Sequence, residues 1–183
     1  MSKAFESNDD KLNKWGKIHK PHFYSYKDNK LQIANYYVHK IFNIPNFIMN
    51  MDNLVDLDIT MNIEHIPDNI GNLINLKYLA IDCAHNYQSP VSNIPNSLFN
   101  LINLECLCIL YTSITNIPKD IIKLQKLKIC LLSNNLITDI PDEIYEIHNL
   151  GFINLYGNPM SESKVKFIEN KVKFNYEFNK LLK

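Results

Sequence analysis

The sequence contains no arginine, so its 19 basic residues are all lysines, and they are balanced by 19 Asp and Glu residues. Proteins that bind duplex nucleic acid usually present a basic stripe in which arginine makes bidentate contacts. Here the centre of the chain is acidic, because residues 31–160 contain 6 lysines against 12 Asp and Glu residues. We therefore expect no nucleic-acid partner.

Long apolar runs are also missing. No stretch approaches the roughly 20 apolar residues that cross a bilayer, and the first residues, MSKAFE, lack the apolar segment of a signal peptide. No Asn-x-Ser/Thr acceptor site occurs, and the four cysteines lie near the middle of the chain without a paired framework. These absences favour a cytoplasmic protein with reduced thiols and no membrane span.

What the sequence does contain is a repeat. The dipeptide Ile-Pro recurs five times, with the prolines 22, 28, 23 and 23 residues apart. Further apolar residues follow each proline after three and six positions. Before each Ile-Pro the same frame can be written, with apolar residues three and five positions after the start of each unit. A closing unit follows the last Ile-Pro, and the six units begin at Leu31, Leu54, Leu76, Leu104, Leu127 and Leu150.

The spacing has a direct physical interpretation. In the segment L-x-x-L-x-L, apolar residues two positions apart fit a short strand with one buried face. Proline then ends the strand because it lacks an N–H and fixes φ. Apolar residues three apart fit a short helical or 3-10 return. One such coil cannot bury its apolar stripe alone, so we expect stacked coils that share a core.

The frame L-x-x-L-x-L-x-x-N-x-L-x-x-I-P, clearest at residues 127–141, resembles the 23-residue intracellular Ras-group class of leucine-rich repeats. The resemblance covers residues 31–160. It implies an α/β solenoid with a concave parallel sheet that binds proteins and short helical or 3-10 segments on the convex side. In the family an asparagine satisfies backbone groups of the turn. Asn135 and Asn158 occupy that position, whereas Thr112 and His39 replace it elsewhere, so we expect less regular turns there.

Two units depart from the period, and both ends depart from the frame. The unit from Leu54 is one residue short, and the unit from Leu76 carries five extra residues within 83–92, which form either a binding loop or a tolerated one. Residues 1–30 form an N-terminal cap, with a helix that covers the first coil through Leu12 and Trp15, and a degenerate strand at 22–26. Residues 161–183 form a C-terminal capping helix whose apolar residues are Val165, Phe167, Ile168, Val172 and Phe174. The alternative for this basic tail is contact with an anionic partner or membrane surface.

Catalytic and metal-binding patterns are missing. The six histidines form no H-E-x-x-H motif, and the four glycines form no phosphate-binding loop. Cys106 and Cys108 should both point away from the core, with only Cys83 near enough to join them. Four-ligand zinc sites usually use Cys-x₂₋₄-Cys pairs, so surface thiols are the favoured interpretation. Cys130 should lie in the core. We expect no enzyme activity, no cofactor and no metal.

The residues that flank the core positions should form the concave face. Its rows begin at Ile33 and Asn35, and the face then divides into an acidic half and an apolar half. The candidate protein-binding residues are Asp56, Asp58, Tyr78, Asp82, Cys106, Cys108, Leu110, Ile129, Leu131, Phe152 and Tyr156, with Tyr111 beside them. Contiguous exposed apolar patches usually mark interaction sites.

This pattern predicts a protein-interaction module or scaffold. Its partner would place an apolar anchor at Ile129 and Phe152 and basic residues near the aspartates. Self-association, or coverage of the patch by the protein's own tail, is the other interpretation. The alternative function, implied only by the family resemblance, is a regulatory subunit of a signalling enzyme in a phosphatase or small-GTPase pathway.

Overall fold

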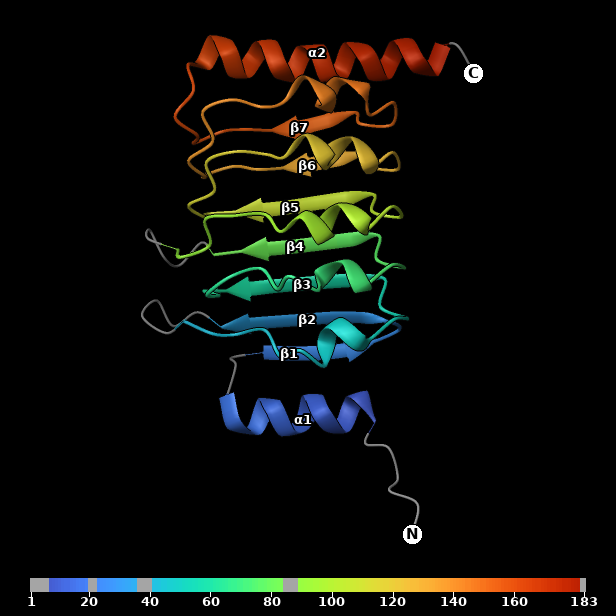
Figure 1. Ribbon diagram of the computed structural model, residues 1–183, viewed down its shortest axis with the longest axis vertical. Helices are drawn as coiled ribbons and strands as arrows, with labels where there is room; N and C mark the ends of the chain where they lie inside the picture. Colours follow the sequence, from blue (N-terminus) through green and yellow to red (C-terminus); the bar gives the residue numbers. More distant parts are fainter. Residues whose placement is uncertain (1–6, 20–22, 36–40, 84–88, 182–183) are drawn as a thin grey trace.

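The chain folds as a stack of coils around one seven-stranded sheet (Figure 1). The computed structural model describes residues 7–19, 23–35, 41–83 and 89–181. Strand order follows chain order; β2 to β7 pair in parallel, and β1 pairs with β2 antiparallel. The elements are α1 (Asn8–His19), β1 (Phe23–Lys27), β2 (Lys30–Asn35), β3 (Asp56–Met61), β4 (Tyr78–Asp82), β5 (Cys106–Leu110), β6 (Ile129–Leu131), β7 (Phe152–Asn154) and α2 (Glu162–Leu181).

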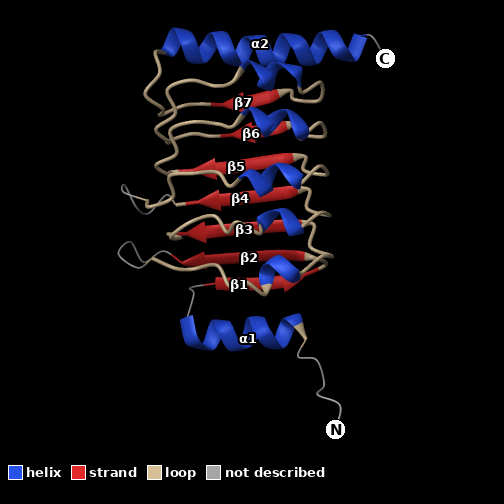
Figure 2. Ribbon diagram, in the orientation of Figure 1, coloured by secondary structure: helices blue, strands red, loops and turns tan. Residues whose placement is uncertain are grey.

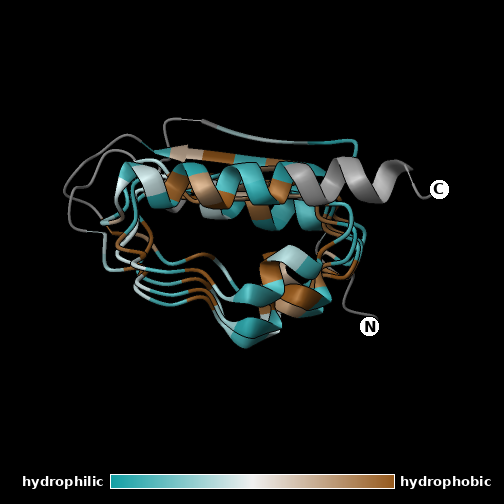
Figure 3. Cartoon of the chain, turned by 90° about the horizontal axis from the view of Figure 1, so that it is seen from above, coloured by the Kyte–Doolittle hydropathy of each residue, from teal (hydrophilic) through white to brown (hydrophobic). Residues whose placement is uncertain are grey.

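The prolines of the Ile-Pro dipeptides direct the chain out of the sheet and into 3-10 helices. Pro95, Pro118 and Pro141 each stand directly before such a helix, with φ between −60° and −69° and extended ψ. The 3-10 helices lie on the other side of the core from the strands (Figures 2 and 3). They span Ile48–Asn50, Ile70–Asn72, Asn96–Asn100, Lys119–Lys123 and Asp142–Glu146. The expected α/β solenoid of strands and 3-10 segments is therefore confirmed.

A single core fills the space between the strands and the 3-10 helices. The frame residues supply it, and Leu57, Leu79 and Leu107 are all 0–1% exposed. The coils stack so closely that Gly71 has no room for a side chain, because a Cβ there would lie 2.2 Å from the backbone oxygen of Ser97 in the next coil. The short unit from Leu54 therefore needs glycine at this contact.

In the first coil, the strand residues are not those that the repeat frame predicts. A tight turn joins β1 to β2, with Asp28 at φ 52° and Asn29 at φ 60°, the left-handed pair of a type I′ hairpin. This hairpin fixes the register of β2, so that Leu31 pairs with Leu57. The repeat frame instead predicts that Leu31 is equivalent to Leu54. The expected alignment was wrong by three residues because a hairpin, and not a repeat unit, sets this strand.

Two residues assigned to the concave face change sides as a result. Ile33 and Asn35 are each 1% exposed and therefore do not begin the concave rows. Their places opposite Asp56 and Asp58 are taken by Lys30 and Gln32. The concave face thus gains a lysine at its N-terminal edge.

Helix α1 lies at the N-terminal end of the stack (Figure 1). As expected, it buries Leu12 and Trp15, which are 1% and 7% exposed. The hydroxyl of Ser7 accepts a 3.1 Å hydrogen bond from the backbone N–H of Asp10, which caps the helix. The expected strand at 22–26 is present as β1, and the hydroxyl of Tyr24 donates a 2.7 Å hydrogen bond to the side chain of Asn13.

Helix α2 lies at the opposite end, beyond β7 (Figure 1). Ile168 and Val172 are each 2% exposed, and Val165 packs against the core beside them. Phe167 is 61% exposed, so its expected place in the apolar face is wrong. Residues 165, 168 and 172 recur at the three- and four-residue spacing of one helix face, and position 167 lies off that face. The side chain of Phe174 lies outside the described residues.

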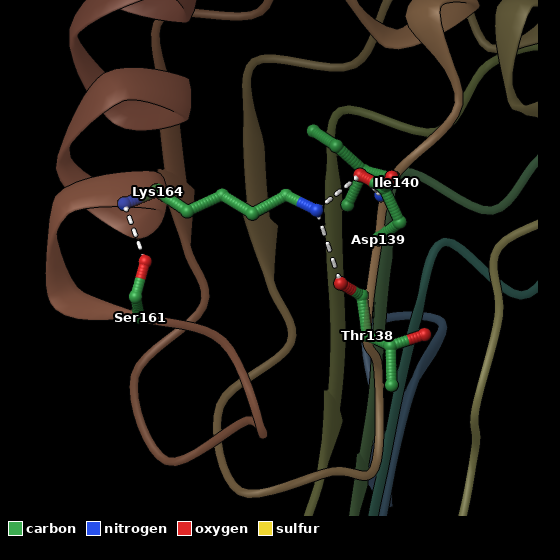
Figure 4. A network of polar contacts seen from close by, with 5 residues as sticks. All are labelled: Thr138, Asp139, Ile140, Ser161 and Lys164. Carbon is green, nitrogen blue, oxygen red and sulfur yellow. Dashed lines mark hydrogen bonds and ion pairs between the residues drawn. The ribbon is translucent and has the colours of Figure 1, made fainter.

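Polar contacts join the start of α2 to the last full coil (Figure 4). The Lys164 ammonium lies 3.1 Å from the Asp139 carboxylate and donates to the backbone oxygen of Thr138 at 3.3 Å. The backbone N–H of Lys164 donates to the Ser161 hydroxyl, which caps the helix. Among the described residues, no helix is long and apolar enough to cross a membrane.

Candidate protein-binding face

Strand register arranges the concave face into rows that cross the sheet, and neighbouring residues of a row lie on adjacent strands about 4.8 Å apart. In the first row Asp56, Tyr78, Cys106, Ile129 and Phe152 lie on successive strands. The second row holds Asp58, Ala80, Cys108, Leu131 and Asn154. In the third, Asp82 pairs with Thr60 and with Leu110. The structure therefore brings the candidate residues of β3 to β7 together on one face, and Tyr156 follows β7 two residues after its end.

The apolar half of the face is exposed at its C-terminal end. Ile129 is 39% exposed, Phe152 is 54% exposed and Tyr156 is 75% exposed. Ile129 and Phe152 are register partners on β6 and β7, so their side chains lie next to each other. Leu110 and Leu131 are half-buried beside them. The exposed part of the predicted patch is therefore concentrated on the last two strands.

Lys30 and Gln32, which the repeat frame did not place on the concave face, contact the acidic half of it. The Lys30 ammonium lies 3.7 Å from the Asp56 carboxylate. The side-chain amide of Gln32 donates to Asp58 at 3.3 Å, and the hydroxyl of Thr60 donates to it at 3.2 Å. Burial raises the pKa of Asp56, and the charge of Lys30 partly offsets this rise. Asp58 and Asp82 extend the acidic surface on β3 and β4.

Cys106 and Cys108 both lie on the concave side, with their sulfur atoms 3.7 Å apart. Cys106 is half-buried, but Cys108 is only 5% exposed, so the expectation of two surface thiols is wrong for Cys108. Burial raises the pKa of the neighbouring Tyr78 hydroxyl.

The other two cysteines lie on the core side of the sheet. Cys83 is 1% exposed and donates to the backbone oxygen of Met61 at 3.5 Å, so it does not join Cys106 and Cys108. Cys130 is 0% exposed, which confirms its core position. Among the described residues, no group of three His, Cys, Asp or Glu side chains is placed to hold a metal ion.

Asparagines join successive coils beyond the C-terminal ends of the strands, as the family resemblance implies. The side-chain amide of Asn135 donates to the backbone oxygens of Ile109 and Leu132, both at 2.8 Å, and its oxygen accepts from the backbone N–H of Thr112. Asn158 repeats the pattern one coil later, donating to Leu132 at 2.7 Å and to Leu155 at 2.9 Å.

Thr112 replaces asparagine at this position, and its hydroxyl donates to Asn135 instead of to backbone carbonyls. The same side chain of Asn135 therefore holds its own turn and the turn before it. The other replaced position, His39, lies outside the described residues.

The residue before each of these positions has a left-handed backbone. Tyr111 has φ 56°, Asn134 has φ 57° and Gly157 has φ 74°. Asparagine and glycine tolerate this conformation, whereas for tyrosine it costs roughly 1–2 kcal/mol. Tyr111 is nevertheless 37% exposed at the edge of the concave face. The occurrence of Asn and Gly at the two equivalent positions was the sequence signal for this strain, and it was missed.

A second asparagine ladder, which the sequence analysis did not predict, lies before the N-terminal ends of the strands. The side-chain amides of Asn75, Asn103 and Asn149 each donate to a backbone oxygen of the preceding coil, at 2.8, 2.9 and 2.7 Å. Lys126 interrupts the series, and its ammonium instead contacts the side-chain oxygen of Asn103 at 2.7 Å. The recurring Asn-Leu dipeptide at the start of the units was the signal.

Residues 84–88 of the insertion lie outside the described residues, but the structure describes its C-terminal flank. The hydroxyl of Ser113 donates to the backbone oxygen of Ser89 at 2.6 Å, and the N–H of Ser113 donates to Val91 at 2.8 Å. The insertion therefore returns to the stack beside Tyr111, at the same ends of the strands as the first asparagine ladder.

No protein-family model matches the sequence, and no curated protein matches it. Solved structures do match. The plant peptide hormone receptor RGFR1 in complex with RGF2 is 29% identical, with a TM-score of 0.57, over 66% of this chain and 19% of the receptor chain. A leucine-rich-repeat protein of Leptospira interrogans is 27% identical, with a TM-score of 0.53, over 77% of this chain and 41% of that one. An internalin C2 from Listeria monocytogenes is 26% identical, with a TM-score of 0.55, over 66% of this chain and 50% of the internalin chain.

This chain thus spans half or less of the length of these three proteins. The chain therefore has the α/β leucine-rich-repeat solenoid fold and resembles leucine-rich-repeat proteins of plants and bacteria.

Proposed function

We propose that the chain is a protein-interaction module that binds one partner protein on its concave face. The observation that carries the proposal is the pair Ile129 and Phe152, which lie next to each other on β6 and β7 and are 39% and 54% exposed. Aliphatic and aromatic side chains in such positions offer the apolar anchor site on which interface affinity is concentrated. Tyr156 and Tyr111 extend this surface, and the strained backbone of Tyr111 is a feature common at binding sites.

The charge of the face favours a particular partner chemistry. Asp56, Asp58 and Asp82 lie on β3 and β4, two to four strands from the apolar pair, and Asp56 forms an ion pair with Lys30. A partner segment that crosses the strands would place an apolar side chain at Ile129 and Phe152 and basic residues toward β3. Strand spacing makes that distance about 10–20 Å. This geometry fits an extended segment of a few residues or a short helix.

The structural neighbours support a binding role. RGFR1, a plant peptide hormone receptor of which this chain matches 19%, was solved in complex with RGF2. The finer assignments are also proposals: a Ras-group repeat type, a scaffold role in signalling and a cytoplasmic location. The repeated 23-residue spacing supports the Ras-group repeat type, and four free thiols are consistent with a cytoplasmic location. A regulatory subunit of a phosphatase or small-GTPase pathway rests on family resemblance alone.

The test uses a displayed peptide library, selected on the full chain, followed by affinity measurement for the enriched sequences. The double variant Ile129→Ser with Phe152→Ser should weaken binding at least about tenfold, because it removes two anchor side chains. The matched control is Ile74→Ser with Ile102→Ser, which removes two isoleucines that are 54% and 58% exposed in the turns before β4 and β5.

Thermal unfolding verifies that both double variants remain folded. Equal affinity of the two variants for the selected peptides would refute the proposal. Sedimentation of the wild-type chain provides a second criterion. A dimer that dissociates in the Ile129 and Phe152 double variant, without peptide selection, would assign this face to self-association instead.

A further inference from the structure

Two thiols lie together on the concave face, separated from the other two by the sheet. Cys106 and Cys108 are alternate residues of β5, so their side chains project from the same face, and their sulfur atoms are 3.7 Å apart. All four cysteines of the chain are among the described residues, and Cys83 and Cys130 are buried at the core side. Only Cys106 and Cys108 are placed to react with each other.

The two thiols are not equivalent. Cys106 is half-buried, whereas Cys108 is 5% exposed beneath its neighbours. The hydrogen bond between the two sulfur atoms lowers the pKa of Cys106, against the effect of burial and of Asp56. The same hydrogen bond, together with burial, raises the pKa of Cys108. Because the thiolate is the nucleophile, Cys106 is the thiol that reacts first with a reagent from solvent.

A bond between them requires a local change of the strand backbone. Alternate residues of a strand have Cα atoms about 6.6–6.8 Å apart, which is the upper limit of about 6.8 Å for a disulfide. A disulfide also needs Cβ atoms about 3.5–4.5 Å apart, so β5 must pucker locally to bring the two Cβ atoms together. A metal ion is a weaker explanation, since no third acidic, histidine or cysteine side chain of the described residues completes a cluster.

We propose that Cys106 and Cys108 form a peroxide-reactive dithiol, in which Cys106 is oxidised first and Cys108 converts it to a disulfide. The Cys106 thiolate attacks a hydroperoxide oxygen, the O–O bond breaks, and the leaving oxygen takes a proton to give water or an alcohol. The Cys108 sulfur then attacks the Cys106 sulfenic acid, the S–O bond breaks, and the proton of Cys108 leaves with the hydroxyl as water. The peroxide is reduced by two electrons, and the two thiols supply them.

The site lies within the first two rows of the concave face, between Tyr78 on β4 and Ile129 on β6. Puckering of β5 would therefore alter the surface assigned to partner binding. The oxidation itself does not depend on that function, and its test needs no partner.

The experiment treats the full folded chain with up to about ten equivalents of hydrogen peroxide and then blocks free thiols with a maleimide at low pH. Cleavage after Glu105 and Lys119 releases residues 106–119, which contain only these two cysteines. The expected fragment is two hydrogen masses lighter than the dithiol and carries no maleimide until it is reduced.

Single variants separate the two roles. In Cys108→Ser the sulfenic acid on Cys106 should persist and react with dimedone, whereas Cys106→Ser should give neither adduct nor disulfide. The control variant Cys83→Ala, changed on the core side, should still form the disulfide if circular dichroism shows it folded. A wild-type fragment that carries two maleimides after peroxide, or sulfinic acid on Cys106 in place of the disulfide, would overturn the proposal.

Discussion

The side-chain amide of Asn135 donates to the backbone oxygen of Ile109, 26 residues earlier in the chain, at 2.8 Å. Asn135 is 2% exposed, and its oxygen accepts from the backbone N–H of Thr112 in the preceding turn. One buried side chain therefore satisfies polar groups in two coils. Stacked coils stabilise each other through such contacts between neighbours as well as through the shared core.

Replacing Asn135 with Ala should destabilise the chain by about 2–4 kcal/mol, because several buried backbone groups lose their partners at once. Urea denaturation followed by circular dichroism measures the change. Asn116→Ala is the matched control, since Asn116 is exposed and donates to the adjacent Thr115 at 3.4 Å. Equal losses for the two variants would show that the ladder adds no stability.

Replacing Tyr111 with Asn should stabilise the chain by about 1 kcal/mol, because asparagine adopts the left-handed backbone at lower cost than tyrosine. The control is Tyr156→Asn, which removes a more exposed tyrosine that lies outside the left-handed positions. Thermal unfolding compares the two. If Tyr111 also contributes to binding, the more stable variant should bind the selected peptides less well. A lower melting temperature for Tyr111→Asn would contradict the strain argument.

The two sides of α2 give a further contrast. Ile168→Ala should cost about 2–4 kcal/mol, the usual result when a fully buried isoleucine is truncated. Phe167→Ala should change the free energy of unfolding by less than about 0.5 kcal/mol, because the ring is 61% exposed. Chemical denaturation of both variants is sufficient. The reverse order would mean that Phe167, and not Ile168, faces the core.

The contact between Asp139 and Lys164 should make stability depend on pH. Hydrogen bonding to Lys164 and to the backbone N–H of Ile140 lowers the pKa of Asp139 in the folded chain. A lowered folded pKa stabilises the fold above the unfolded pKa of about 3.9, and this stability is lost as pH falls through the folded pKa. Because the pair is exposed, the effect should be only about a few tenths of a kcal/mol.

The measurement is the unfolding free energy of the wild type and of Asp139→Asn between pH 7 and pH 2. The difference should be present at pH 7 and should shrink toward zero at the acid end. In a double-mutant cycle, Lys164→Gln should remove most of the difference. A difference that is constant with pH would show that Asp139 does not act through its charge.

The repeat frame was sufficient to predict the strands from β3 onward, since Leu57, Leu79, Leu107 and Ile153 lie in the core as their spacing requires. It failed for β2, where the turn at Asp28 and Asn29 fixes the register and a frame search matches the wrong residues. Phe167 was misassigned for a similar reason: composition marked it as apolar, but only the orientation of α2 against the core decides which apolar residues are buried.

The candidate face divides in the same way. Alternation along each strand correctly placed Asp56, Tyr78, Ile129 and Phe152 on the side away from the core. It could not show that Lys30 would lie beside Asp56 or that Cys108 would be covered. Both results depend on which strands become neighbours.

The sequence by itself determined the solenoid, its prolines and its asparagine positions, because a one-dimensional repeat records local periodicity and contacts between successive coils. The tertiary structure alone decided how the hairpin begins the sheet and which concave residues remain exposed. It also decided that two thiols lie 3.7 Å apart. These features depend on register, packing depth and backbone dihedrals, which the residue pattern does not specify.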